Sequence, residues 1–325
     1  MKIVLVRSNF LVMFSLILIT FSSCSPASLF DSPSGKSEVI DQQPTPEWTF
    51  PNPPASEKRI TFLAVGDAGT GEDAQKIVAS GMAHSAENRK AGFVLYLGDN
   101  FYESGVSSVS DPLWQTAFET VYNQSSLQIP FYAILGNHDY YGNEEAELEY
   151  ALSHDRWKMP ARYYSFSAGI SPGDSIDFFA LDTEMLLDET SDEAKAQLVW
   201  LDAELKQSSA IWKVVFGHHP VRSNGEHGNT GELVALLKPI LEENKVTAYF
   251  CGHDHHLELI KPENGVNYIV SGAGGKRRNV TWRKNTKFAS TNFGFVSVEA
   301  SATYFAVTFH ARFGNVIYSE VIGKK

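Results

Sequence analysis

Six apolar runs, each long enough for a buried strand, follow one another along the chain after residue 58, and five of them end in the same way. Each of the five finishes in Gly followed by Asp, Asn or His: Gly66-Asp67, Gly98-Asp99, Gly136-Asn137, Gly217-His218 and Gly252-His253. Near-continuous apolar character is typical of strands buried on both faces. Because ligands bind at the carboxyl ends of strands in open α/β sheets, the pattern predicts five strands that deliver polar side chains to one edge.

Helix-length amphipathic segments separate several of these runs. The runs occupy 60–67, 92–99, 130–139, 176–183, 212–220 and 246–255, and the segments occupy 72–90, 111–123, 144–155, 192–207 and 231–243. Strand–helix alternation predicts a mainly parallel α/β core. In segment 192–207, Ser191 or Asp192 is the expected N-terminal cap. After residue 256, short strand patterns separated by turns predict an antiparallel or mixed sheet that completes the same domain, 58–325.

The first 57 residues differ from the rest in composition. Residues 1–24 combine Lys2 and Arg7 with an apolar run from Phe10 to Phe21 and then small residues, the pattern of a secretory signal peptide. The run is shorter than the roughly 20 residues of a membrane span, and a signal anchor is the alternative. Residues 25–57 are rich in Pro, Ser and acidic residues, which predicts a flexible tether.

The sequence FSSCS at 21–25 resembles a bacterial lipobox, in which Cys24 is lipidated, and cleavage without lipidation is the alternative. Only Cys24 and Cys251 are present, so no intramolecular disulfide can form once Cys24 is lipidated or removed. We therefore expect an exported protein without disulfides. The expected location is a bacterial membrane, as a periplasmic or cell-surface lipoprotein, and otherwise the protein is secreted.

The net charge of −11 disfavours nucleic acid and anionic lipid surfaces as general partners. We expect contact with a membrane only through a lipid on Cys24, and we expect a monomer. An anionic substrate would have to be attracted by local positive charge. The basic segment 276–287 is one candidate for that charge, either as a lip that attracts substrate or as an ordinary solvated loop.

The polar residues at the strand ends form a set with the chemistry of metal ligands. They are Asp67, Asp99, Tyr102, Asn137, His138, His218, His253 and His255. Carboxylates, an amide oxygen and imidazoles together suit first-row transition metals better than Ca²⁺ or Mg²⁺. The set is too large for one such ion and fits two, and two metals about 3.5–4 Å apart can clamp an in-line phosphoryl displacement. The alternative is that these residues only cap the turns after the strands.

The sequences GDAG, GDNFY, GNHD, GHHP and GHDHH, in this order, resemble the five-block pattern of the calcineurin-like metallophosphoesterases. Tyr102, three residues after Asp99, narrows the resemblance to purple acid phosphatases of the small tartrate-resistant type. The resemblance extends from about Arg59 nearly to the end of the chain. It implies a four-layer α/β/β/α sandwich with mixed sheets.

The resemblance also implies how the metals are held. Fe(III) would be held by Asp67, Tyr102 and His255, a divalent iron, zinc or manganese ion by Asn137, His218 and His253, and Asp99 would bridge the two. The chemistry of the Tyr102 phenol supports the Fe(III) assignment independently of the resemblance. A group with a pKa of about 10 ionises in acid only beside a strong Lewis acid, and a trivalent ion is one.

The implied activity is hydrolysis of phosphomonoesters by in-line attack of a metal-activated hydroxide, at acid pH. His138 would stabilise charge on the phosphoryl oxygens. His227, nine residues after His218, matches the family's candidate acid, and Glu226 is the other candidate for protonating the leaving group. His227 and Glu226 could instead be ordinary surface residues.

Two rival functions remain open at this point. One is a Mn- or Zn-type phosphodiesterase or nucleotidase of the same superfamily, and the other is a metal- or phosphate-binding surface lipoprotein without activity. His219 and His256 are expected at the wall of the site rather than as ligands, and His84, His154 and His310 are expected to be structural. The segment 186–195 is shorter than the loop that represses the mammalian relatives, which predicts no activation by proteolysis.

Overall fold

The computed structural model describes residues 58–323 of the 325-residue chain. The predicted signal peptide (1–24) and tether (25–57) lie outside the described residues. Within the described part of the chain, no helix combines the length and the apolar character that a membrane span requires.

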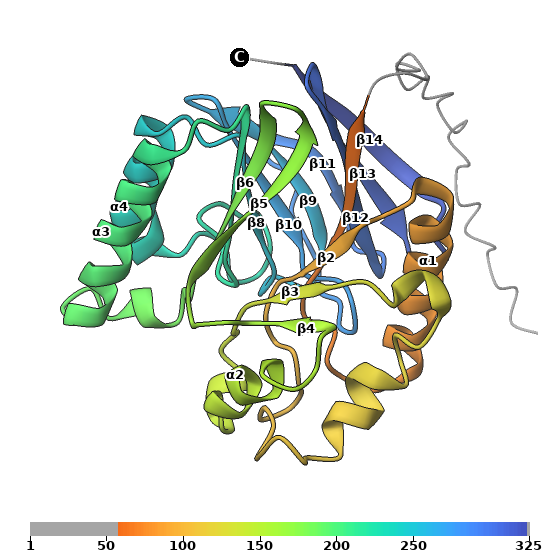
Figure 1. The fold of residues 1–325 in the computed structure, drawn as a ribbon. Coiled ribbons are helices and arrows are strands. Elements are labelled where there is room, and N and C mark those ends of the chain that lie inside the picture. Colours follow the sequence, from red (N-terminus) through yellow and green to blue (C-terminus); the bar gives the residue numbers. More distant parts are fainter. Residues whose placement is uncertain (1–57, 324–325) are drawn as a thin grey trace, which may run out of the picture. The chain divides into compact units, whose positions relative to one another are not determined.

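Two seven-stranded sheets form the centre of the described domain (Figure 1). The first has the order β14-β13-β12-β1-β2-β3-β4, and the second has the order β11-β9-β10-β8-β7-β6-β5. The strands of the first sheet are β1 (Arg59–Val65), β2 (Phe93–Tyr96), β3 (Phe131–Ala133), β4 (Trp157–Lys158), β12 (Gly294–Ser301), β13 (Tyr304–Ala311) and β14 (Val316–Gly323). The strands of the second sheet are β5 (Tyr164–Ser171), β6 (Asp174–Ala180), β7 (Trp212–Phe216), β8 (Ala248–Cys251), β9 (Leu257–Glu263), β10 (Val266–Ser271) and β11 (Thr286–Ser290).

Both sheets are mixed, as expected. Neighbours from β1 to β4 run parallel, and so do β6, β7, β8 and β10 in the second sheet. The later strands β12, β13 and β14 pair antiparallel, and β9 pairs antiparallel with β10 and β11. The change from parallel to antiparallel pairing after residue 256 therefore has two exceptions, the parallel pair β8–β10 after it and the antiparallel pair β5–β6 before it.

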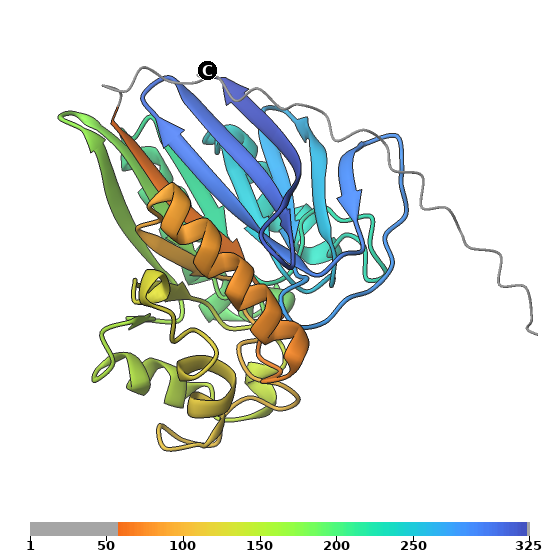
Figure 2. The ribbon, with the colours of Figure 1, turned by 90° about the vertical axis from the view of Figure 1, so that its right-hand side faces the viewer.

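Helices cover the outer face of each sheet, which confirms the four-layer α/β/β/α sandwich. The α-helices are α1 (Asp73–Arg89), α2 (Glu145–Ala151), α3 (Asp192–Gln207) and α4 (Gly231–Glu243). The first, α1, packs on β1 and β12 (Figure 2), and α3 and α4 lie together on the other side of the domain (Figure 1). Ser191 is the cap of α3, and its hydroxyl accepts a hydrogen bond from the Ala194 N–H at 3.0 Å.

The predicted helix at 111–123 is wrong in type and extent. The chain there forms a π-helical turn at Trp114–Glu119. Short 3₁₀ turns occur at three other places, Ser125–Leu127, Asp139–Tyr141 and Met185–Leu187. Trp114 stacks on Tyr150 with ring centroids 3.5 Å apart, and Phe118 packs edge-on against Trp157 at 4.9 Å. Tertiary contacts of these large rings decide the local conformation here, since intrinsic helix propensity is a weak preference.

An aromatic-rich core joins the two sheets. Phe62 of β1 is fully buried and packs edge-on against Phe178 of β6, with ring centroids 5.2 Å apart, and against Phe250 of β8 at 6.2 Å. Burying a phenylalanine side chain contributes about 1.5–3 kcal/mol. The core therefore fixes how one sheet lies on the other, and with it the relative position of the strand ends.

Candidate metal centre

The five strand ends with the Gly-X pattern bring all seven predicted metal ligands together. Three of these residues have the left-handed backbone conformation, with φ of 55° at Asp67, 50° at Asp99 and 65° at His253. This conformation is costly for residues other than glycine and concentrates at functional sites. At Gly136 no side chain fits, because a Cβ there would lie 2.2 Å from the backbone nitrogen of Asp99. The turns are therefore shaped for close approach of the ligands.

One cluster consists of Asp67, Tyr102 and His255. The Tyr102 hydroxyl lies 3.2 Å from Asp67 Oδ1 and 3.4 Å from His255 Nε2, and His255 Nε2 lies 3.3 Å from Asp67 Oδ1. All three side chains are buried. A phenol oxygen, a carboxylate oxygen and an imidazole nitrogen thus converge on one point.

A second cluster consists of Asn137, His218 and His253. Asn137 Oδ1 lies 3.2 Å from His218 Nε2 and 3.1 Å from His253 Nδ1, and the two imidazole nitrogens are 3.2 Å apart. His218 Nδ1 lies 2.9 Å from the Leu97 carbonyl oxygen, which can only accept a hydrogen bond. The Nδ1 atom therefore carries the proton, and the lone pair of Nε2 faces the cluster.

Asp99 lies between the two clusters. Its Oδ2 accepts a hydrogen bond from the Tyr102 hydroxyl at 2.8 Å, and its Oδ1 lies 3.4 Å from His218 Nε2. Asp99 is almost fully buried. One carboxylate oxygen thus belongs to each cluster, which is the geometry that a bridging ligand requires.

Burial favours the uncharged forms of the histidines and of the phenol. Burial, with positive charge at Arg278, lowers the pKa of His255 to about 4. Burial and then the neighbouring histidines lower the pKa of His253. Burial, Asp67 and Asp99 raise the pKa of the Tyr102 hydroxyl far above its usual value. Neutral imidazole is the form that binds metals, whereas ionising this phenol requires strong compensating positive charge.

The donor set fits two cations. Asn137 Oδ1 and His218 Nε2 are both hydrogen-bond acceptors, yet they point at one another at 3.2 Å. The Asp67 carboxylate is fully buried, and burial raises its pKa well above the usual range. Converging lone pairs and buried carboxylates are stabilised when a positive ion lies between them. Nitrogen and oxygen donors without thiolate suit first-row transition metals.

His138 lies at the edge of the first cluster. Its ring packs edge-on against Tyr102 with centroids 4.6 Å apart, and its Nδ1 is 2.6 Å from the Glu103 carbonyl oxygen. Its Nε2 lies 4.0 Å from Asp99 Oδ2, and a quarter of the side chain is exposed. The imidazole is therefore held in place while Nε2 remains beside the metal-binding oxygens.

Asp139, which the sequence did not single out, positions the turns that carry candidate ligands. The carboxylate is fully buried and accepts hydrogen bonds from the backbone N–H groups of Asn100 (2.9 Å), Phe101 (3.1 Å) and Gly136 (2.8 Å). These contacts tie the turn after β2 to the turn after β3. The only signal in the sequence is its place next to His138 in GNHD.

Of the two candidate acids, His227 lies nearer to the metal-binding residues. Its ring centroid is 4.3 Å from that of His253, and its Nε2 contacts the Arg278 guanidinium. Glu226 is exposed, and its Oε1 accepts a hydrogen bond from the Asn279 N–H at 3.4 Å. Burial, and then Arg278, lowers the pKa of His227, and Asp254 opposes this.

Asp254 holds the loop that carries both candidate acids. Its buried carboxylate accepts hydrogen bonds from the His227 N–H at 2.9 Å and the Gly228 N–H at 3.1 Å, and also from the Ser223 hydroxyl. Sequence reasoning did not single out Asp254, although it lies between His253 and His255. A fully buried carboxylate between two candidate metal ligands therefore positions the loop 223–228.

His219 and His256 have partners outside the two clusters. The Thr183 hydroxyl lies 3.0 Å from His219 Nδ1, and His256 Nε2 lies 3.1 Å from the Glu258 carboxylate, which is also fully buried. A ring nitrogen of His219 does come within 4.8 Å of those of His218 and His253. Burial lowers the pKa of His219 to about 3, which keeps it neutral at the wall of the second cluster.

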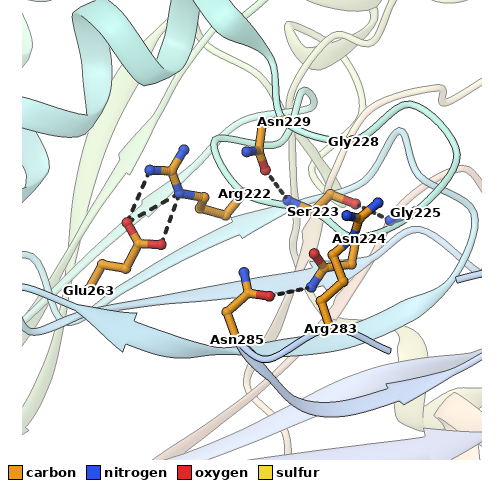
Figure 3. A pocket seen from close by; sticks show the side chains of 9 residues that line it. All are labelled: Arg222, Ser223, Asn224, Gly225, Gly228, Asn229, Glu263, Arg283 and Asn285. Carbon is orange, nitrogen blue, oxygen red and sulfur yellow. Dashed lines mark hydrogen bonds and ion pairs between the residues drawn. The ribbon is translucent and has the colours of Figure 1, made fainter. Parts of the chain in front are cut away.

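The basic segment 276–287 packs beside the candidate metal ligands through its backbone, while most of its side chains between Arg277 and Lys284 are exposed. The Arg278 N–H donates to the His255 carbonyl oxygen at 2.7 Å, the Thr281 N–H donates to that of Asn224 at 3.0 Å, and a β-bridge joins Gly225 to Val280. Two cavities adjoin these contacts. One of about 400 Å³ is lined by Glu226, Arg277, Arg278, Asn279 and Thr291. The other, of about 500 Å³, is shown in Figure 3.

Known proteins share this fold and sequence. The calcineurin-like phosphoesterase family matches residues 60–257. Tartrate-resistant acid phosphatase type 5 of Oryctolagus cuniculus is 40% identical over 236 residues, which cover 66% of this chain and 73% of that protein. Purple acid phosphatase 7 of Arabidopsis thaliana is 34% identical over 297 residues, covering 83% and 88%. The solved structure of GAP50, the anchor in the inner membrane complex of Plasmodium, matches with a TM-score of 0.77 and 26% identity, over 83% of this chain and 90% of that one.

These matches establish the family. The family pattern spans more than half of the chain, and both enzyme relatives are at least 34% identical over at least 73% of their own lengths. The chain therefore belongs to the calcineurin-like phosphoesterases and, within them, to the purple acid phosphatases, acid phosphatases that act on small phosphorylated substrates at a binuclear metal centre.

Proposed function

We propose that this acid phosphatase holds Fe(III) in the cluster of Asp67, Tyr102 and His255 and a divalent ion in the cluster of Asn137, His218 and His253. Asp99 would bridge them. The observation that carries the proposal is the presence of a buried phenol in only one of two clusters that share a carboxylate. The divalent ion would be iron, zinc or manganese, since all three accept nitrogen and oxygen ligands.

When bound, the two ions would supply an activated water and positive charge for the phosphoryl oxygens. The chain's own residues then have separate tasks. His138 Nε2, held by the contact of Nδ1 with the Glu103 carbonyl, would donate a hydrogen bond to a phosphoryl oxygen. The wall formed by His219 and His253 would limit the access of water to the second cluster.

The leaving alkoxide requires a proton, and two residues are placed to provide it. His227 Nε2 contacts Arg278, so delivery from this atom requires Arg278 to turn away. Glu226 is exposed and bound only weakly to the Asn279 N–H. Substituting each residue separately and comparing substrates with good and poor leaving groups identifies the donor, because only a poor leaving group depends on protonation.

The visible absorption spectrum of the purified, metal-loaded protein tests the iron assignment. A phenolate on Fe(III) gives a broad visible band that changes when a mild reductant is added. Tyr102→Phe should abolish this band. Tyr132→Phe is the matched control, because Tyr132 is packed against Phe166 in the core and should leave the band unchanged.

A colourless protein that carries two metals and hydrolyses phosphomonoesters would remove Fe(III) and the role of Tyr102 from the proposal. Preference for a phosphodiester such as bis(p-nitrophenyl) phosphate would favour the Mn- or Zn-type alternative. A fully loaded protein that hydrolyses neither substrate would favour a binding role, as the description of GAP50 as an anchor suggests for that relative.

We also propose that the protein is exported and attached to a membrane through a lipid on Cys24, and that it is a monomer. The support is the sequence of residues 1–24, with its apolar run and FSSCS. Incorporation of a labelled fatty acid tests the lipid, and Cys24→Ala should abolish it. Sedimentation of the soluble domain tests the monomer.

A further inference from the structure

The basic segment places Arg278 next to the candidate metal ligands. Arg278 is fixed through its backbone N–H, which donates to the His255 carbonyl oxygen at 2.7 Å, and its guanidinium contacts His227. His227 in turn lies against His253, with ring centroids 4.3 Å apart. A single imidazole therefore separates Arg278 from a residue of the second cluster.

Arg277 and Arg278 both line the cavity of about 400 Å³ together with Glu226, Asn279 and Thr291. The neighbouring Lys276 is neutralised by Glu103, with its Nζ 2.7 Å from the carboxylate. Among the described residues, no carboxylate lies within ion-pair distance of either arginine. Two guanidinium groups against the single carboxylate of Glu226 leave the lining of this cavity net positive, on a chain whose net charge is −11.

The cavity in Figure 3 has a different character. There Arg222 faces Glu263 and donates to both carboxylate oxygens, at 3.0 Å from Nε and 3.1 Å from Nη2. Asn224 Nδ2 reaches Asn285 Oδ1 at 3.2 Å across the same space. One of the two arginines of this cavity is thus paired with its carboxylate, and only Arg283 has no carboxylate partner there among the described residues. In the cavity of Arg277 and Arg278, neither guanidinium group is paired with a carboxylate of the described part of the chain.

We infer that the cavity of Arg277 and Arg278 is an accessory site for a second phosphate group, so that the enzyme prefers phosphomonoesters whose leaving group is itself phosphorylated. The inference rests on the proposed hydrolysis at the metal centre. Arginine binds phosphate through paired hydrogen bonds, and a cavity of this volume accommodates such a group. The bond changes are those of ester hydrolysis: the oxygen of water bonds to phosphorus, the ester P–O bond breaks, and the alcohol leaves with a proton.

The test compares fructose 1,6-bisphosphate with fructose 6-phosphate, measured as initial release of inorganic phosphate by the metal-loaded full chain. We expect kcat/KM to favour the bisphosphate by about tenfold, mainly through KM, and less at high ionic strength. Arg277→Gln should remove this preference and leave the rate on fructose 6-phosphate unchanged, because Arg277 is exposed and touches none of the metal-binding residues. Lys284→Gln, with the same loss of charge in the same segment and outside the cavity, is the matched control.

Equal kcat/KM for the two substrates, or a preference that Arg277→Gln reduces no more than Lys284→Gln does, would overturn the inference. Absence of hydrolysis of both substrates would instead contradict the proposed function. In that case the affinity for fructose 1,6-bisphosphate, measured by calorimetry, still tests the accessory phosphate site. Arg277→Gln must weaken this affinity by about tenfold, and equal affinity of the variant and the wild type would overturn the inference.

Discussion

Three residues of the metal centre adopt a backbone conformation that is unfavourable for them in isolation. Asp67, Asp99 and His253 all have positive φ, and each such residue costs on the order of 1–3 kcal/mol. This conformational cost is offset by hydrogen bonds that the backbone and side chains of these three residues make. The His253 N–H donates to Asp67 Oδ2 at 2.9 Å, and the His138 N–H donates to Asp99 Oδ1 at 3.0 Å. Each strained residue is thereby held with its side chain directed at the centre.

At the residue scale, His310 should set part of the stability of the enzyme in acid. It is buried in β13, where the Ser297 hydroxyl lies 2.8 Å from Nε2, and Nδ1 donates to the Gly314 carbonyl at 2.9 Å. Burial lowers its pKa to about 4, whereas an unfolded chain has a histidine pKa near 6.5. The unfolded state therefore binds a proton first, and stability falls as the pH drops from about 6.5 to about 4, by roughly 3 kcal/mol.

Urea unfolding at pH 7 and at pH 4.5 measures this effect. His310→Gln should be less stable than the wild type at pH 7 but should lose less stability on acidification. His84→Gln, at an exposed histidine of α1, should show the same pH dependence as the wild type. If His310→Gln and the wild type lost equal stability between the two pH values, the role given to His310 would be wrong.

At the scale of elements, loops rather than helices or strands complete the site. The segment 223–228 is held on one side by Asp254 and on the other by Glu258, whose buried carboxylate accepts from the Asn224 N–H at 2.9 Å and from Asn224 Nδ2 at 2.7 Å. The basic segment then pairs with the same loop through the Gly225–Val280 bridge. Buried charged groups with all partners in place give a loop one defined position.

Asp254→Asn should loosen this loop without emptying the metal sites. An amide has only one oxygen to accept from the N–H groups of His227 and Gly228 and the hydroxyl of Ser223, so at least one buried donor loses its partner. We expect kcat to fall by about tenfold to a hundredfold with metal content unchanged. Asp177→Asn, which removes a carboxylate that accepts from Ser167 and Ser208, is the matched control. Loss of metal in Asp254→Asn would show instead that Asp254 acts on the ligands themselves.

The segment 186–195 should not act as a removable inhibitor. Leu186 is fully buried in the core beside α3 and α4, and Ser191 caps α3, so the segment is anchored to the packed structure at Leu186 and at the start of α3. Limited trypsin treatment of the pure enzyme should leave turnover unchanged or lower it. A severalfold rise in turnover after cleavage in this segment would contradict the prediction.

At the scale of the whole molecule, the centre joins the two sheets. Asp67, Asp99 and Asn137 follow strands of the first sheet, and His218, His253 and His255 follow strands of the second. Ions bound between them would link the two sheets on the side where the strand ends meet, in addition to the aromatic core. Metal binding should therefore contribute to the stability of the entire fold and not only to catalysis.

Removal of the metals by a chelator should lower the melting temperature. A ligand present at about 100 times its Kd stabilises by about 2.7 kcal/mol, which corresponds to roughly 5–10 °C for a domain of this size. Thermal unfolding with and without chelator, followed by readdition of metal, measures this change. Asp99→Asn lacks the bridging carboxylate and should respond less to chelation. An unchanged melting temperature of the wild type after verified metal loss would contradict the coupling between the sheets.

The sequence alone determined the strand ends and the chemistry that they carry. Apolar periodicity and the glycines before Asp67, Asp99 and His253 are local signals, since each depends on residues within one strand and its turn. For the same reason α3 and α4 were predicted with their exact bounds, and α1 to within one residue at each end. The signal was weakest at 111–123, where packing of Trp114 and Phe118 prevails over local preference.

Only the tertiary structure decided the partners of these residues. The His253 N–H donates to Asp67, 186 residues away in the sequence. Arg278 contacts His227 at a sequence separation of 51 residues, and the His227 N–H donates to Asp254 at a separation of 27 residues. Such contacts depend on how the two sheets pack and on where the loops lie against them. No pattern within one segment of the sequence specifies this packing. This is why the candidate metal ligands could be named from the sequence, whereas Asp139, Asp254 and the arginine-lined cavity became evident only in the folded chain.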